Sequence, residues 1–245
     1  MNKRSDIIYG IRTVIEALKS GQHLERVFIQ KNLKGDLYKE LMLKLRFTPT
    51  PISKVPLERI NKFTRKNHQG AVALLSPIQY HSLGQLVPWL FLEGKNPLIV
   101  VLDAITDVRN FGAIARTCEC FGVHSIVIPT KGGAQVNEDA IKTSAGALNH
   151  QTVCRENNLV EAVKFLQESG FQIVACSEKT QNNLNKVDFT GPTCLMLGSE
   201  ERGISQGLMD ISNSIVKIKM SGKIASLNVS VAAGIALYEI QRQRY

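Results

Sequence analysis

The sequence predicts two α/β domains, a small first one and a second one built on a parallel sheet covered by helices on both faces. From Pro97 onwards, short continuous apolar runs alternate with helix-like segments, and such runs are typical of strands buried on both faces. A stretch rich in proline and glycine separates this part from a basic first third. We therefore expect an amino-terminal domain over residues 1–76, a linker over 77–96 and a second domain over 97–245.

The first domain is expected to alternate helices and strands. Apolar residues recur at three- and four-residue spacing over 11–18, which predicts an amphipathic helix that ends at Gly21. Runs of β-branched and apolar residues predict the strands, and periodic segments predict the other helices. The further strands are expected at 24–30, 50–55 and 70–75, and the further helices at 36–46 and 56–63.

The second domain should contain six strands and five helices. Ligands of such sheets bind at the loops that follow the carboxyl ends of the strands, so these loops are the place to look for a site. A short helix is also possible within the linker, at 86–92. The strands are expected at 98–103, 124–129, 151–154, 172–177, 194–198 and 214–220, and the helices at 110–121, 137–147, 158–169, 204–211 and 228–243.

The last of these helices is apolar around most of its circumference. Either Ser226 or Asn228 can cap its amino terminus. Gly234 in mid-helix costs about 1 kcal/mol relative to alanine, which favours a close packing partner there. The helix is either a capped core helix or part of a ligand cradle followed by a subunit interface. Because it is too apolar for a monomer surface, we expect a homodimer.

Composition narrows the class of protein. With 44% hydrophobic and 21% charged residues, the 245-residue chain is typical of a globular protein. No apolar run approaches the roughly 20 residues that span a bilayer. The apolar positions of the first 21 residues are periodic, so we expect no signal peptide. Five scattered cysteines favour buried free thiols and a cytoplasmic protein.

The net charge of +9 is concentrated in the first third. Residues 1–80 contain 15 Lys/Arg and 6 Asp/Glu (15 − 6 = +9), whereas residues 81–245 contain 15 of each. This division favours a nucleic-acid-binding module beside a catalytic one, and a basic surface that only aids solubility is the alternative. TRKNHQG, at 64–70, is either a loop that contacts phosphates or bases or a polar turn.

Three glycine-bearing polar loops follow predicted strands. Residues 110–116 read N-x-G-x-x-x-R, residues 198–203 read G-x-E-x-x-G, and residues 221–228 read SGKIASLN. No G-x-G-x-x-G follows a strand, and there is no P-loop, G-x-S-x-G or cluster of zinc ligands. Cys118 and Cys120 are two apart on a predicted helix and cannot grip one metal ion together. Hydride transfer, nucleotide hydrolysis, serine hydrolysis and metal chemistry are therefore disfavoured.

These loops resemble a known family. NFGAIART (110–117), LGSEERGIS (197–205) and IKMSGKIASLNVSVAAGIALYE (218–239) are similar, in order and spacing, to the three motifs of the SpoU branch of SPOUT RNA methyltransferases. YGIRTVIEAL and HQGAVA resemble the substrate-binding domain of bacterial 23S rRNA guanosine-2′-O-methyltransferases. One departure is Lys219, where the family usually has proline. The resemblance implies a carboxy-terminal trefoil knot, which is an exception to unknotted topology, S-adenosylmethionine bound in the knot, and a dimer.

The resemblance also implies the site residues. Glu200 would orient Arg116. Asn110, Asn228 and Ser226 would fix the nucleotide by hydrogen bonds. Backbone groups of Gly198, Ile218 and Leu227 would hold S-adenosylmethionine. The implied catalytic residues are Arg116, Glu200, Asn110, Ser226 and Asn228, and the cofactor-binding candidates are Gly198, Ile218, Leu227 and Met220. Thr180 is a further cofactor-binding candidate because it follows the strand predicted at 172–177.

Arg116 is the expected centre of the chemistry. The family's usual proposal makes the matching arginine a general base, but a guanidinium group stays protonated at ordinary pH. We favour a grip on the target's phosphate that stabilises the developing alkoxide, with a phosphate-assisted proton relay as the alternative. A purely structural ion pair with Glu200 is a third possibility. At the level of the whole protein, the rivals are a tRNA ribose methyltransferase and a nonenzymatic RNA-binding protein that retains the knot.

Overall fold

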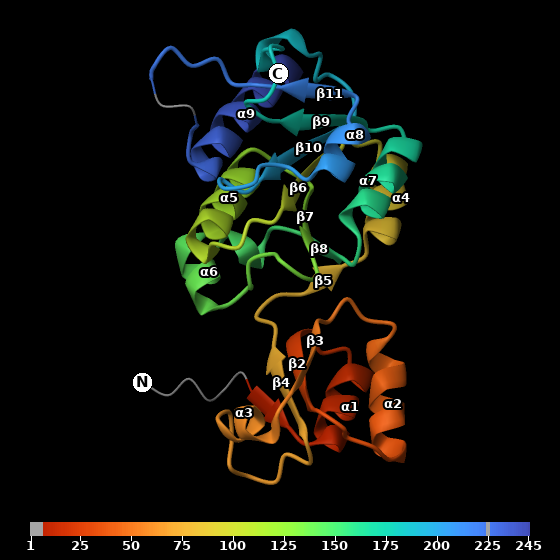
Figure 1. The fold of residues 1–245 in the computed structure, drawn as a ribbon. Coiled ribbons are helices and arrows are strands. Elements are labelled where there is room, and N and C mark those ends of the chain that lie inside the picture. Colours follow the sequence, from red (N-terminus) through yellow and green to blue (C-terminus); the bar gives the residue numbers. More distant parts are fainter. Residues whose placement is uncertain (1–6, 224–225) are drawn as a thin grey trace. The chain divides into compact units, whose positions relative to one another are not determined.

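The computed structural model describes residues 7–223 and 226–245. The first six residues, which begin the segment judged not to be a signal peptide, and residues 224–225 of the third motif lie outside the described residues. The chain divides into two compact units, Met1–Gln79 and Tyr80–Tyr245 (Figure 1). Within the described ranges, no helix is long and apolar enough to cross a membrane.

The first unit is a four-stranded mixed sheet with helices on both faces. In the sheet order β1-β4-β2-β3, β4 is antiparallel to both neighbours, whereas β2 and β3 are parallel. As a result β1, β2 and β3 run in one direction and end at the same edge. The elements are β1 (Ile7–Tyr9), α1 (Ile11–Lys19), β2 (Leu24–Gln30), α2 (Asp36–Leu45), β3 (Ile52–Val55), α3 (Leu57–Asn61) and β4 (Ala71–Leu75).

The two faces of this sheet carry separate cores. Val27 and Ile29 of β2 pack with α1 and α2, whereas Phe28, between them, packs with Ile60 of α3 on the other face. This division follows from the two-residue period of a strand. The Phe28 ring also lies 4.6 Å, centroid to centroid, from the Phe63 ring.

The second unit is a seven-stranded sheet in which every described strand pair is parallel. The order is β11-β9-β10-β6-β7-β8-β5. The strands are β5 (Tyr80–His81), β6 (Leu98–Asp103), β7 (Ser125–Pro129), β8 (Val153–Glu156), β9 (Gln172–Cys176), β10 (Thr193–Gly198) and β11 (Ser214–Val216), and the helices are α4 (Leu83–Leu92), α5 (Val108–Cys120), α6 (Glu138–Thr143), α7 (Leu159–Glu168), α8 (Gln206–Asp210) and α9 (Val229–Arg244).

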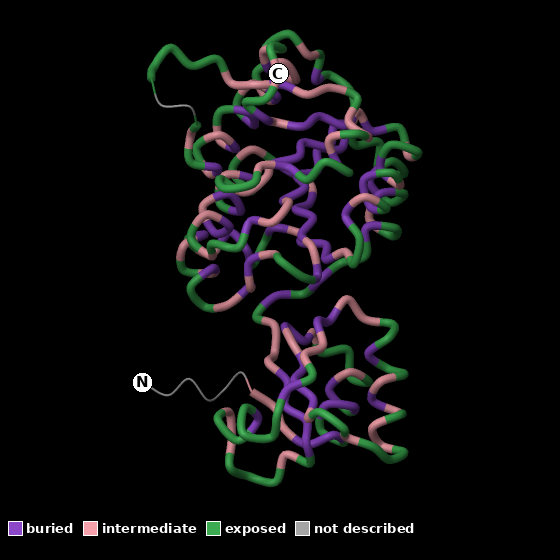
Figure 2. The backbone as a smooth tube through the Cα atoms, viewed as in Figure 1, coloured by how far each residue is buried: buried purple, intermediate pink, exposed green. Residues whose placement is uncertain are grey.

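Helices cover both faces of this sheet. The α4, α7 and α8 helices lie on one face, and α5, α6 and α9 lie on the other (Figure 1). The central strands β6 and β10 are buried along almost their whole length (Figure 2). This burial explains why their sequences, LIVVLD and TCLMLG, are continuously apolar and not alternating.

Several elements differ from their predicted extents. The strand predicted at 214–220 ends at Val216, so residues 217–220 are free to line the cavity described below. The helix predicted at 137–147 ends at Thr143, because Ala145 and Gly146 adopt left-handed backbone angles (φ 51° and 86°) before a short 3-10 turn. Residues 77–96 contain β5, which pairs with β8, and α4, which includes the helix expected at 86–92.

Candidate active site

The loops that follow β6, β9, β10 and β11 meet at one edge of the second sheet. These four strands are neighbours in the sheet and parallel, so their carboxyl ends face the same way. Gly198, which ends β10, is in register with Asp103, which ends β6. The Asp103 carboxylate then accepts a 2.7 Å hydrogen bond from the backbone N–H of Ser205, which ties the two loops together.

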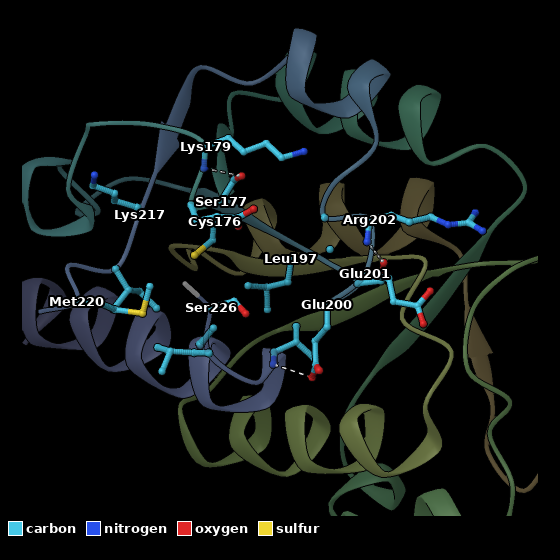
Figure 3. A pocket seen from close by; sticks show the side chains of 18 of the residues that line it. Cys176, Ser177, Lys179, Leu197, Glu200, Glu201, Arg202, Lys217, Met220 and Ser226 are labelled. Carbon is cyan, nitrogen blue, oxygen red and sulfur yellow. Dashed lines mark hydrogen bonds between the residues drawn. The ribbon is translucent and has the colours of Figure 1, made fainter. Parts of the chain in front are cut away.

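The loops that follow β9, β10 and β11, together with the start of α9, line a cavity of about 600 Å³. Its wall comes from the ends of β9 and β10, the segment after β11 and the beginning of α9; Cys176, Leu197 and Ser226 lie around it, whereas the Arg202 side chain extends away (Figure 3). The volume is in the usual range for small-molecule sites. Of the predicted site residues, six line the cavity: Gly198, Glu200, Ile218, Met220, Ser226 and Leu227.

A hydrogen-bond network joins three segments beside this cavity. The Glu200 Oε1 atom accepts hydrogen bonds from the side-chain amides of Asn228 (2.7 Å) and Asn110 (3.2 Å) and from the backbone N–H of Val229 (3.3 Å). The Asn228 amide also donates to Asn110 Oδ1 (3.0 Å). The carboxylate thereby lies at the amino terminus of α9, where the helix dipole favours a negative charge. The network brings together one residue of each of the three sequence motifs.

Helix capping orients two of these groups. Asn228 is the amino-terminal cap of α9, because its Oδ1 accepts from the Ser230 backbone N–H (2.9 Å), and its Nδ2 is then free to face Glu200. At α5, the Asp107 carboxylate accepts from the Asn110 backbone N–H (2.8 Å). Asn228, not Ser226, is therefore the cap, and its cap bond fixes the direction of its amide.

Gly198 is required by the close approach of the next loop. A Cβ atom at this position would lie 2.1 Å from the Gly203 carbonyl carbon. The loop 199–203 is closed by a 2.8 Å hydrogen bond from Gly203 N–H to the Ser199 carbonyl. The absence of a side chain thus lets the Glu200 loop fold back over the end of β10.

Two predicted site residues, Arg116 and Thr180, belong neither to the cavity lining nor to the Glu200 network. Arg116 lies six positions after Asn110 on α5, about 120° away around the helix. Its side chain is exposed, does not line the cavity, and has no hydrogen bond or ion pair to any described residue, including Glu200. Thr180 does not line the cavity either, and its Oγ1 accepts from the backbone N–H of Asn182 (3.2 Å).

The structure also identifies lining residues that sequence reasoning did not select. The end of β9 contributes Cys176 and Ser177, and the segment after β11 contributes Lys217. Burial raises the pKa of the Cys176 thiol to about 11, and nearby Glu178 acts in the same direction, so this thiol stays protonated at neutral pH. No group of three or more His, Cys, Asp or Glu side chains within 7–223 and 226–245 could hold a metal ion.

Both units of the chain match known protein families. Residues 97–238 match the SpoU rRNA Methylase family, and residues 7–81 match the family described as RNA 2′-O ribose methyltransferase substrate binding. The chain belongs to the SpoU rRNA methylase family. The predicted fold class, a parallel-sheet SPOUT domain preceded by a small α/β domain, is confirmed.

Individual relatives agree with this assignment. A Synechocystis protein named as an uncharacterized tRNA/rRNA methyltransferase is 37% identical over 98% of this chain, which spans only 63% of that relative's length. A Bacillus subtilis protein named for the TrmH family of tRNA/rRNA methyltransferases is 31% identical over the full chain and 98% of its own length. The fold is similar to that of the AdoMet-bound rRNA methyltransferase from Sinorhizobium meliloti (TM-score 0.63, 22% identity, covering 99% of this chain and 88% of that one).

Proposed function

We propose that this protein transfers the methyl group of S-adenosylmethionine to a ribose 2′-oxygen of RNA, at a guanosine of 23S rRNA. The observation that carries the proposal is the Asn110–Glu200–Asn228 network beside the cavity at the strand ends. The family matched by residues 7–81 is named for ribose 2′-O methylation, and the relative from Sinorhizobium meliloti binds AdoMet. Both names support the proposed reaction.

The lining of the cavity fits the cofactor. Gly198 lines the cavity without a side chain of its own, and Ile218 and Leu227 offer apolar walls together with main-chain donors and acceptors. We assign the same binding role to Met220, whose side chain is 38% exposed. When bound there, S-adenosylmethionine supplies a methyl group already activated by its positive sulfur.

The chain's own residues would position and stabilise the nucleotide. S-adenosylmethionine held beside Gly198, Ile218 and Leu227 would supply the methyl group to the ribose 2′-oxygen and keep the carbon–sulfur bonding electrons on its sulfur, and the hydroxyl proton would pass to water. We assign to Arg116 a grip on the target's phosphate that stabilises the developing alkoxide. Its exposed guanidinium, free of ion pairs to described residues, supports this role. Asn110, Ser226 and Asn228 would orient the ribose.

We further infer that α9 pairs two copies of the chain. The Val231, Ile235 and Tyr238 side chains recur at helical spacing and are 50%, 39% and 61% exposed. An apolar stripe on a helix that otherwise packs against α5 is suited to an isologous contact with a second copy.

A tRNA ribose is the alternative substrate, because the two relatives are named for tRNA and rRNA alike. Methylation of in-vitro-transcribed 23S rRNA and of transcribed tRNA, followed by mapping of 2′-O-methyl positions, distinguishes the two. We expect modification of the 23S transcript. If the wild-type protein methylates neither RNA in the presence of S-adenosylmethionine, the proposed function is wrong.

Arg116→Ala tests the role of this arginine. Single-turnover methylation should slow by about 10²–10³, the effect of losing one preorganised donor, while cofactor affinity stays nearly unchanged. Arg116→Lys should restore little, because an ammonium cannot reproduce the planar fork. Glu119→Ala, an exposed change three residues along the same helix, is the matched control. Near-normal turnover of Arg116→Ala would remove Arg116 from the mechanism.

A further inference from the structure

The first unit has one edge at which three strands end and one begins. Hydrogen bonds tie this edge together: Gly10 N–H donates to Ala71 (3.0 Å), Gln30 N–H to Gly70 (2.8 Å) and Lys31 N–H to Val55 (2.8 Å). We call it the strand-end edge. It consists of the first turn of α1, residues 31–36, α3, and the loop 62–70 that leads into β4.

Positive charge is concentrated at the strand-end edge. Seven exposed basic side chains belong to it, and none of them forms an ion pair with a described residue. Only two acidic side chains lie there, Glu58 and Asp36, and Asp36 is already paired with Lys39 (3.2 Å). The seven are Arg12, Lys31, Lys34, Arg59, Lys62, Arg65 and Lys66.

The opposite edge is different. Lys19, at the end of α1, is neutralised by Glu16 (3.0 Å) and Glu40 (3.3 Å). Two exposed basic side chains at the end of α2, Lys44 and Arg46, have no ion pair to a described residue there, and Arg26, near the start of β2, is half-buried. The surplus of charge is therefore not spread evenly over a solvated surface but gathers where the strands end.

The loop 62–70 holds a defined shape. The Gly70 N–H donates to His68 Nδ1 (3.0 Å), so the ring's hydrogen is on Nε2, which donates to Asn61 Oδ1 (2.9 Å). Gln69 and Gly70 both have left-handed backbone angles (φ 49° and 80°). The turn leaves the side-chain amides of Asn67 and Gln69 exposed among the lysines and arginines.

The aromatic ring of Tyr9 lies beside this loop. The Lys66 ammonium is 5.9 Å from the centroid of the Tyr9 ring at the end of β1. Carboxamides can read the edges of unpaired bases, and cationic side chains hold phosphates, whereas a paired RNA helix hides its base edges in a narrow groove. The combination suits an RNA loop with unpaired bases better than a duplex.

We propose that the strand-end edge binds the substrate RNA, with its basic side chains on the phosphates and the loop 62–70 on unpaired bases near the target. This inference rests on the proposed function, because it takes the ligand to be the RNA that is methylated. Beyond that function, it specifies which surface of the first unit holds the RNA and which form of RNA this surface selects.

Two charge-matched variants of the full chain test the proposal. Arg65→Gln/Lys66→Gln removes one arginine and one lysine from the strand-end edge, and Lys44→Gln/Arg46→Gln removes the same pair from the opposite edge. Filter binding of in-vitro-transcribed 23S rRNA over a series of salt concentrations gives the affinity and its salt slope. Isothermal titration with S-adenosylmethionine serves as the folding control.

The two variants should behave differently. The strand-end variant should weaken binding by about tenfold or more, and its slope of log affinity against log salt should fall by about 1.4–1.8, or 0.7–0.9 for each lost phosphate contact. The opposite-edge variant should stay within about twofold of wild type. Equal losses in both variants, or an unchanged slope in the strand-end variant, would overturn the proposal.

A third variant tests the base contact. Asn67→Ala should weaken binding of the 23S transcript at least threefold and leave the salt slope unchanged, because an amide contributes no counterion release. Wild-type affinity in Asn67→Ala would refute the reading of bases by this loop. If the wild-type chain binds RNA with these slopes but methylates none, the binding surface stands and the proposed function fails.

Discussion

The methyl group added by Gly198→Ala would overlap backbone atoms of the neighbouring loop. The new Cβ would be 2.1 Å from the Gly203 carbonyl carbon and 2.3 Å from the Ile204 nitrogen, whereas ordinary contact begins at 3.4 Å. The loop 199–203 must therefore move by about 1.3 Å (3.4 − 2.1). Glu200 belongs to this loop, and a shift of that size lengthens its 2.7 Å bond to Asn228 beyond hydrogen-bond range.

The magnitude follows from two effects. Overpacking of this kind costs about 1–3 kcal/mol. For a unit the size of the second one, that corresponds to a fall in melting temperature of roughly 2–12 °C. Misplacement of a catalytic group by about 1 Å typically costs a further 10² in rate. We expect Gly198→Ala to lose at least tenfold in S-adenosylmethionine affinity and about 10² in single-turnover rate.

Calorimetric titration and single-turnover methylation measure the two quantities. Gly191→Ala is the control, because no atom lies within 4 Å of its added Cβ and its backbone is not in the left-handed region. It should behave as wild type. Wild-type cofactor affinity and melting in Gly198→Ala would refute the reasoning from the close loop approach.

Two further predictions concern α9. Arg244 donates to the carbonyls of Phe189 (2.9 Å), Asn96 (3.0 Å) and Gly191 (2.7 Å), so Arg244→Ala should destabilise the second unit by about 2–3 kcal/mol. Thermal unfolding should show this loss, and Arg242→Ala, on the exposed side, should show little. Ile235→Asp should raise the dimer dissociation constant by roughly 10²-fold or more, because an unpaired charge in an interface costs several kcal/mol. Sedimentation that shows an unchanged dimer would contradict the α9 contact.

The sequence predicted most of the second unit because its strands are continuously apolar. The strand predicted at 98–103 coincides with β6, since LIVVLD is buried on both faces. The short strands β1 and β5 were missed, because three and two residues carry no recognisable period. Their positions depend on pairing with distant strands, which a local pattern does not encode.

Part of the candidate site could also be predicted from the sequence. Parallel strands end at one edge, so the convergence of Asn110, Glu200 and Asn228 followed from their places after strands. The spacing of the first motif and the period of a helix already place Arg116 about 120° around α5 from Asn110, so its separation from the network could have been predicted. Asp107 and Asp103, which hold the loops, were overlooked because each is an ordinary acidic residue until its backbone partner is known.

The network at Glu200 also bears on how the second unit folds. Its bonds join residues 90 and 118 positions apart in the chain, so long loops must close before the network can exist. Contacts of such high sequence separation form slowly, and a parallel sheet adds to the delay. The carboxylate of Glu200 has Asn228 and the backbone N–H of Val229 as partners only when α9 has docked. During refolding from denaturant, recovery of S-adenosylmethionine binding should therefore lag behind the return of helical signal, and the lag should measure the docking of α9.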